Sequence, residues 1–295
     1  MVERAPGTSV PRRRLARLLR HHRELAGLTL EEVVAEKYAS RPTMWRVEKG
    51  DPHVRYQRGL IENLARLYNV DDETLKVMVA LAQETQNKGW LHAFGDVIPE
   101  NFELYLDLEA TASRLTWYES ELVPGLLQTK NYASAVISSI EDRDEVETLR
   151  RVQVRLARQA VLTRQSPAPP TVDIVLNEAI LQRPVGGAAV MAEQLRHINE
   201  ASELPNVTVR VVPFEGGMHH GVLSGPFVIL YFSPSNGDIE PTTVYLDGLC
   251  GAVYLDQKHQ VREYKATFRN LQANALRDEA SREWIDEAAR RFDKQ

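Results

Sequence analysis

The segment from Ser40 to Gly50 carries side chains that could contact the bases of a DNA duplex. If it forms a helix that lies in the major groove, the side chains of its first turn and the outward positions one turn later would reach base edges. An arginine there can pair bidentately with guanine O6 and N7, and a tryptophan can pack on a thymine methyl group or on sugar. These candidate residues are Arg41, Pro42, Trp45 and Arg46.

A second set of side chains has the chemistry to bind phosphate and so to set the register on DNA. These hydroxyl, ammonium and guanidinium groups stand at expected helix starts and loop edges, at Thr29, Thr43, Lys49 and Arg55. The alternative interpretation is a solvated face, since most clusters of charged residues are one. Spacing alone does not decide between the two.

The elements that must position these residues are five short helices. Apolar spacing, caps and breakers predict them over Pro11 to about Gly27, Leu30–Glu36, a helix capped by Ser40 and ended by Gly50, Gln57–Tyr68 and Asp72–Gln83. Met44 and Val47 have the opposite spacing to Trp45 and Arg46, so we expect them in the core. A brief turn joins the second and third helices, which is typical of a helix-turn-helix.

Charge is divided unevenly along the chain. Residues 1–82 carry 15 Lys+Arg and 11 Asp+Glu, whereas residues 83–295 carry 21 and 30. A basic segment ahead of an acidic body favours a phosphate-binding module joined to a regulatory domain.

Several classes of protein are not expected. No apolar run approaches the length of a membrane span, and Arg17 and Arg20 interrupt the leucines that a signal peptide would need. The single cysteine, Cys250, allows no internal disulfide and no multi-cysteine zinc site. We therefore expect a cytoplasmic protein that does not contact a membrane.

The chain beyond the first helices mixes helices and strands. Strand patterns cover Val172–Leu176, Val207–Val212, Phe227–Phe232, Thr243–Leu246 and Ala252–Leu255. Helical patterns cover Tyr132–Ile140, Glu145–Thr163, Ala188–Glu203, Val261–Ala275 and Ser281–Phe292. The prediction is a multi-domain chain: a flexible tail (1–11), an all-α helix-turn-helix domain (12–83), a linker (84–99) and an α+β domain (100–295) for regulation and dimerisation.

Two runs carry a resemblance to a known family. The sequences G-L-T-L-E-E-V at 27–33 and S-R-P-T-M-W-R-V-E-K-G at 40–50 resemble the xenobiotic-response-element (XRE) family, relatives of phage repressors. The resemblance implies a lambda-repressor-like domain that binds double-stranded DNA, commonly as a homodimer. Lys37, Tyr38 and Leu30 depart from the family pattern in and before the turn.

The rest of the chain resembles the antitoxin-like domain that follows such a helix-turn-helix in many actinobacterial regulators. The matching segments are residues 118–119, 122–129, 132–133, 177–179, 194–195 and 204–214. This resemblance implies a regulator that is often paired with a small protein encoded by a neighbouring gene. The alternatives are a transcription regulator that receives a signal, an antitoxin-like protein that sequesters the small protein, and a sensor of a small ligand.

An enzyme is the remote alternative, because the usual constellations fail. The serine of the G-V-L-S-G run at 221–225 stands one place late for a nucleophile elbow, and the adjacent pairs His21–His22 and His219–His220 lack metal-binding spacing. We expect no catalytic residue, no cofactor and no metal. Residues 216–221 are interpreted as a mobile surface loop or a lid over a ligand.

Overall fold

The computed structural model describes residues 10–51, 53–85, 98, 100–139, 144–233, 240–248 and 251–294. The chain forms two compact units: the N-terminal helices together with residues 100–111 and the described part of 233–240, and a second unit built on a sheet. The prediction of a helical N-terminal part followed by a mixed sheet with helices is confirmed. Most of the expected tail and linker, and Cys250, lie outside the described residues, so the domain limits stay predictions.

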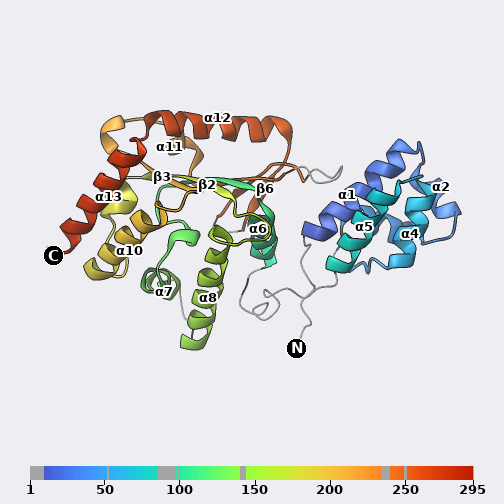
Figure 1. The fold of residues 1–295 in the computed structure, drawn as a ribbon, viewed down its shortest axis with the longest axis horizontal. Helices are drawn as coiled ribbons and strands as arrows, with labels where there is room; N and C mark the ends of the chain where they lie inside the picture. The colour runs from blue at the N-terminus through green and yellow to red at the C-terminus, as the bar shows by residue number, and fades with distance from the viewer. Residues whose placement is uncertain are drawn as a thin grey trace. The chain divides into compact units, whose positions relative to one another are not determined.

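The described residues of the N-terminal part form five helices (Figure 1): α1 (Val10–Leu25), α2 (Leu30–Ala35), α3 (Arg41–Lys49), α4 (Arg58–Leu67) and α5 (Asp72–Glu84). Their apolar faces meet in one core in which Leu15, Leu19, Met44, Ile61 and Leu64 are fully buried. The expected burial of Met44 and Val47 is confirmed. The amphipathic spacing read from the sequence therefore corresponds to the packing of this unit.

The second unit holds a six-stranded sheet in the order β3-β2-β1-β4-β5-β6. The strands are β1 (Arg114–Glu119), β2 (Thr171–Asn177), β3 (Val207–Val212), β4 (Phe227–Tyr231), β5 (Thr243–Leu246) and β6 (Val253–Leu255). β1, β2 and β3 are parallel, and β4, β5 and β6 pair antiparallel. The central strand β1 was not predicted, although its four central residues Leu115–Tyr118 are buried and three of them are of types that are common in strands.

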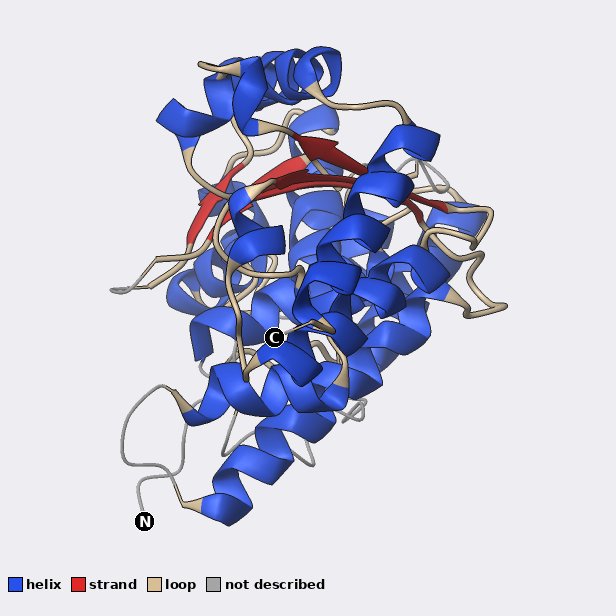
Figure 2. Cartoon of the chain, turned by 90° about the vertical axis from the view of Figure 1, so that its left-hand side faces the viewer, coloured by secondary structure: helices blue, strands red, loops and turns tan. Residues whose placement is uncertain are grey.

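Helices cover both faces of this sheet (Figures 1 and 2): α11 and α12 lie on one face and α7, α8 and α10 on the other. The helices after α5 are α6 (Glu100–Thr111), α7 (Lys130–Ser138), α8 (Glu145–Arg158), α9 (Ala179–Gln182), α10 (Ala188–Ala201), α11 (His220–Ser224), α12 (Lys258–Asn274) and α13 (Asp278–Phe292). Phe268 and Leu271 of α12 pack on Phe227 and Ile229 of β4. Burial on both faces explains the continuous apolar runs of β2 and β4.

The segment 216–221 corrects one expectation. Residues Phe214–Gly216 form a 3-10 turn, and α11 begins at His220, so interpreting the whole run as a mobile surface loop is wrong at its C-terminal end. His219 is buried, and Gly221 lies directly against the ring of Tyr118. A side chain at position 221 would prevent this approach, so the glycine serves close packing rather than loop freedom.

Candidate nucleic-acid interface

The helix pair α2 and α3 is fixed at its ends by local hydrogen bonds. The Thr29 hydroxyl accepts from the Glu32 amide (3.2 Å), and the Glu32 carboxylate accepts from the Thr29 amide (2.7 Å), which makes a capping box. The Ser40 hydroxyl accepts from the Thr43 amide at 3.4 Å. α3 ends at Gly50 in the left-handed conformation, with φ 69°. The caps expected at Thr29, Ser40 and Gly50 are confirmed.

The turn between α2 and α3 contains a residue in an unfavourable conformation. Lys37 has φ 62°, in the left-handed region that is costly for a residue that carries a Cβ. Lys37 is one of the turn residues that depart from the pattern of the resembling family. The turn forms nevertheless, because the packed helices on both sides hold its ends.

Lys37→Gly is expected to stabilise the helical unit by about 0.5–1 kcal/mol. The left-handed conformation costs a non-glycine residue about 1–2 kcal/mol, and the greater freedom of glycine in the unfolded chain cancels part of that gain. Urea unfolding followed by circular dichroism measures the change. Asn69→Gly is the matched control, since Asn69 has φ 54° but asparagine tolerates this region. Equal shifts in both variants would contradict the explanation.

Side-chain hydrogen bonds join the inner side of α3 to α1 and to the segment before α4. Arg23 of α1 makes two bonds to the Glu48 carboxylate, with Nε–Oε1 at 2.6 Å and Nη2–Oε2 at 2.9 Å. The Tyr56 hydroxyl donates to the Val47 carbonyl at 2.8 Å. Bidentate charge-assisted bonds fix orientation as well as distance. These bonds fix the orientation of α3 relative to α1.

The outer surface of α3 presents an exposed aromatic ring among cations. Trp45 is 55% exposed, and the Lys49 Nζ lies 5.9 Å from the centroid of its ring. Arg46 is also exposed, and within the described part of the chain its guanidinium group has no hydrogen bond or ion pair. These three side chains are available to another molecule.

Arg41 differs from Arg46 because it is already paired. Its Nη2 lies 2.6 Å from Oε1 of Glu31 across the turn. Both side chains are more than 60% exposed, so the pair contributes little to stability and can open at low cost. Arg41 would have to exchange Glu31 for a base. The sequence did not indicate Glu31 as a partner of Arg41. The two residues are ten positions apart, and the turn between α2 and α3 brings them together.

The structure brings together six of the eight predicted DNA-binding residues on α3: Arg41, Pro42, Thr43, Trp45, Arg46 and Lys49. Thr29 stands apart at the start of α2, and its hydroxyl is occupied by the capping box. The Thr43 hydroxyl is 2.8 Å from that of Ser40. Arg55 is exposed between α3 and α4. Arg58 was not predicted as a DNA-binding residue, but it lies only three residues after Arg55. It is the first residue of α4, its side chain is 69% exposed, and it pairs with Glu62.

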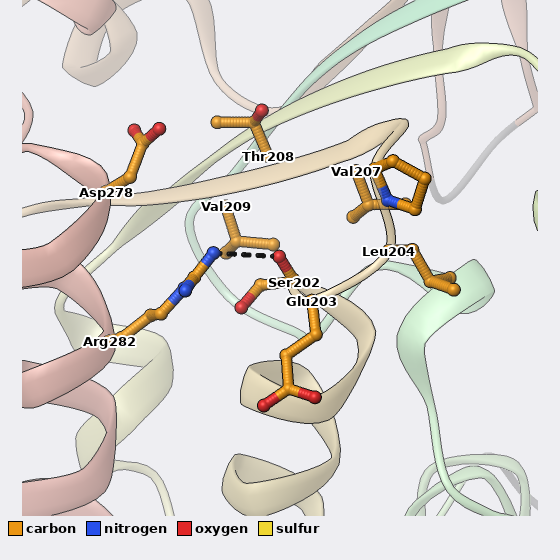
Figure 3. Close-up of a pocket in the computed structure, with 9 residues that line it drawn as sticks. Ser202, Glu203, Leu204, Val207, Thr208, Val209, Asp278 and Arg282 are labelled. Atoms are coloured by element: carbon orange, nitrogen blue, oxygen red, sulfur yellow. Dashed lines mark hydrogen bonds between the residues drawn. The ribbon is translucent and has the colours of Figure 1, made fainter.

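The sheet unit contains a small cavity between the end of α10, β3 and α13 (Figure 3). Its volume is about 220 Å³, and the Arg282 side chain points into it, where Nη2 donates to the Ser202 carbonyl at 3.0 Å. Pockets that bind drug-sized ligands usually measure about 300–1,000 Å³. This cavity is therefore no basis for assigning a ligand.

A half-buried carboxyl group, that of Glu119, lies at the end of β1. Trp117 Nε1 donates to Oε1 of Glu119 at 3.0 Å. Burial raises the pKa of Glu119 to about 7, and the nearby negative charges of Asp247 and Glu121 act in the same direction. The carboxyl group can therefore remain protonated in the folded chain at pH values where an exposed glutamate is charged.

Removing this group is expected to change how stability depends on pH. The free energy of unfolding of the wild-type chain should fall as pH rises from about 4.5 to about 7, because the folded state retains a proton that the unfolded state releases. Glu119→Gln stays neutral and should be more stable than wild type at pH 8 by about 1–2 kcal/mol, allowing for partial solvent contact. Urea unfolding at pH 5 and pH 8 tests this. Parallel pH profiles for the two proteins would contradict it.

Among the described residues, no helix is long and apolar enough to cross a membrane. No group of three or more His, Cys, Asp and Glu side chains within the same part of the chain could hold a metal ion.

Comparison with known proteins divides the chain in two. Residues 14–77 match a family model described as a helix-turn-helix domain. Residues 102–287 match a family model described as a domain of unknown function, DUF5753. No curated protein and no solved structure matches the chain.

Proposed function

Since the chain belongs to the DUF5753 family and carries a helix-turn-helix domain ahead of that match, we propose that it is a transcription regulator that recognises DNA through α3. In this proposal Arg46 and Arg41 contact guanine, Trp45 packs on a thymine methyl group or on sugar, and Lys49, Arg55, Thr29 and Thr43 set the register on the phosphates.

The observation that carries the proposal is the division of α3 into two faces. Met44 and Val47 are fully buried, while the adjacent Trp45 is 55% exposed beside Arg46, which has no ion pair among the described residues. The exposed ring of Trp45 lies close to the Lys49 ammonium group and next to Arg46, so this face offers apolar surface and positive charge to one partner. Base edges and sugars in a major groove would cover it.

The finer parts of the proposal follow from the resemblance. The regulator is of the XRE type and acts in the cytoplasm as a homodimer on paired half-sites about one DNA turn apart. Its sheet unit receives a signal from a small protein or a ligand. The proposal includes no catalytic activity, cofactor or metal.

The test is a selection of bound duplexes from random DNA by the purified full-length protein and by Arg41→Ala/Arg46→Ala. The control variant Arg20→Ala/Arg66→Ala also removes two exposed arginines outside α3, of which Arg20 is paired with Glu24 as Arg41 is with Glu31. An enriched two-fold symmetric motif that only the α3 variant loses is the expected result. No enrichment at low salt, or the same loss in the control, would overturn the proposal.

A second candidate function is sequestration of a small protein, with DNA binding for autoregulation. The observation that favours it is a cluster of exposed apolar side chains in and before α11: Phe214, Met218, Val222 and Leu223, each more than 50% exposed. Such clusters on a monomer surface often mark protein contacts. A complex with the co-expressed neighbouring-gene protein that Val222→Ser/Leu223→Ser breaks would support this function. An intact complex in that variant would count against it.

A further inference from the structure

A row of four cations runs along the outer side of α12, far in sequence from the helix-turn-helix. Lys258, Arg262, Lys265 and Arg269 follow one another at intervals of four, three and four residues. At 3.6 residues per turn these positions fall within an arc of roughly 60° and extend over roughly 16 Å of the helix. The buried positions Val261, Phe268 and Leu271 lie on the side of α12 that packs on the sheet.

The charge of this row is not balanced by carboxylates. Within the described residues, Lys258, Arg262 and Arg269 form no ion pair, and Glu263 is the single acidic residue of α12. Some other arginines of the same unit are paired, as Arg183 is with Glu121 and Arg210 with Asp278. An uncompensated row of cations attracts anions more strongly than one in which each charge is paired.

A fifth cation from the sheet joins the row through an aromatic ring. The Lys265 Nζ lies 4.7 Å, and the Arg114 Cζ 5.4 Å, from the centroid of the Tyr231 ring. Arg114 remains 49% exposed and lies 3.8 Å from Asp173. Tyr231 therefore holds Arg114 beside Lys265 at the end of β4, and the basic surface widens beyond the helix. Figure 1 shows α12 along the face of the sheet opposite to α8 and α10.

We propose that this basic row, Lys258, Arg262, Lys265 and Arg269 with Arg114, binds the phosphate backbone of duplex DNA outside the bases recognised by α3. The occupant follows from charge complementarity: residues 83–295 carry nine more acidic than basic residues, yet α12 carries four basic residues and one acidic residue. A linear polyanion matches a linear row of cations, whereas the acidic remainder of the unit repels DNA. The inference rests on the proposed DNA-binding function and extends it to the sheet unit.

The experiment compares three full-length proteins: wild type, Arg262→Gln/Arg269→Gln, and Arg290→Gln/Arg291→Gln. The last is a matched control, because it removes two exposed arginines of α13 that have no ion pair within the described residues. Affinities are measured over a series of salt concentrations. The duplexes are the selected motif alone, the same motif extended by two turns on each side, and an extended duplex of unrelated sequence.

Wild type should bind the extended motif more tightly than the short one, with a steeper dependence of log affinity on log salt. The α12 variant should show no such gain. Its slope on both extended duplexes should fall by about 0.9 for each phosphate that is no longer neutralised, so by about 1.8 for two arginines. On the short motif it should bind as wild type does. The control should follow wild type throughout.

The outcomes separate the two proposals. Slopes equal to wild type in the α12 variant, or equal reductions in the α12 and control variants, would overturn the role of α12. Binding without sequence preference, with a reduced slope only in the α12 variant, would overturn base recognition by α3 and support the α12 contact. Absence of binding to any duplex at low salt would overturn both.

Discussion

Arg46→Ala is expected to lower the affinity for the selected duplex by about 10- to 100-fold and to relax base preference at one position of each half-site. A bidentate contact from arginine to guanine contributes about 1–3 kcal/mol of discrimination. Arg46 is the exposed arginine of α3 that has no intramolecular partner within the described residues. Its removal therefore breaks no ion pair in the protein, and the change in affinity reports the lost contact with DNA. Competition binding with all single-base variants of the motif measures both effects.

Lys49→Ala separates base recognition from phosphate binding on the same helix. Lys49 lies at the last residue of α3, with its ammonium group near the Trp45 ring. Its removal should weaken binding to all duplexes by a similar factor and reduce the salt slope by about 1. The assigned roles would be wrong if Lys49→Ala changed base preference as much as Arg46→Ala, or if Arg46→Ala weakened every duplex alike.

Gly221→Ala should destabilise the sheet unit by about 2–3 kcal/mol. A Cβ at this position would lie 2.6 Å from Cε1 and Cζ of Tyr118 and 2.8 Å from Cδ2 of Leu271, so α11 would have to move from the sheet. Overpacking in a dense core typically costs about 1–3 kcal/mol, and a rigid ring gives little room for adjustment. Urea unfolding followed by tryptophan fluorescence and circular dichroism measures the transition of this unit.

Gly216→Ala is the control for that substitution. Its Cβ would meet no atom closer than the Asn274 carbonyl oxygen, at 3.9 Å, so we expect a change close to zero. A similar loss in both variants would mean that chain flexibility, rather than contact with Tyr118, requires the glycine. Unchanged stability in Gly221→Ala would mean that α11 does not pack on the sheet in solution.

The sequence by itself determined the local structure of the helix-turn-helix. The caps at Thr29 and Ser40 and the left-handed end at Gly50 depend on groups within a few residues, and side-chain chemistry at that distance is read directly from the chain. The buried positions Met44 and Val47 follow from helical periodicity. Thus the face of α3 that carries Trp45 and Arg46 could be predicted.

The tertiary structure decided what depends on partners far away in sequence. β1 is a short strand whose central place follows from pairing with β2 and β4, which buries Thr116 in the sheet. α11 can pack against the ring of Tyr118, which is more than 100 residues away, because position 221 is a glycine. The sequence pattern predicted a helix from Val261. Packing of α12 on the sheet decides that its row of cations stays exposed, and it places Lys265 and Arg114 on the ring of Tyr231. Short-range bonds are encoded in neighbouring residues, whereas the surface that remains exposed depends on the whole folded chain.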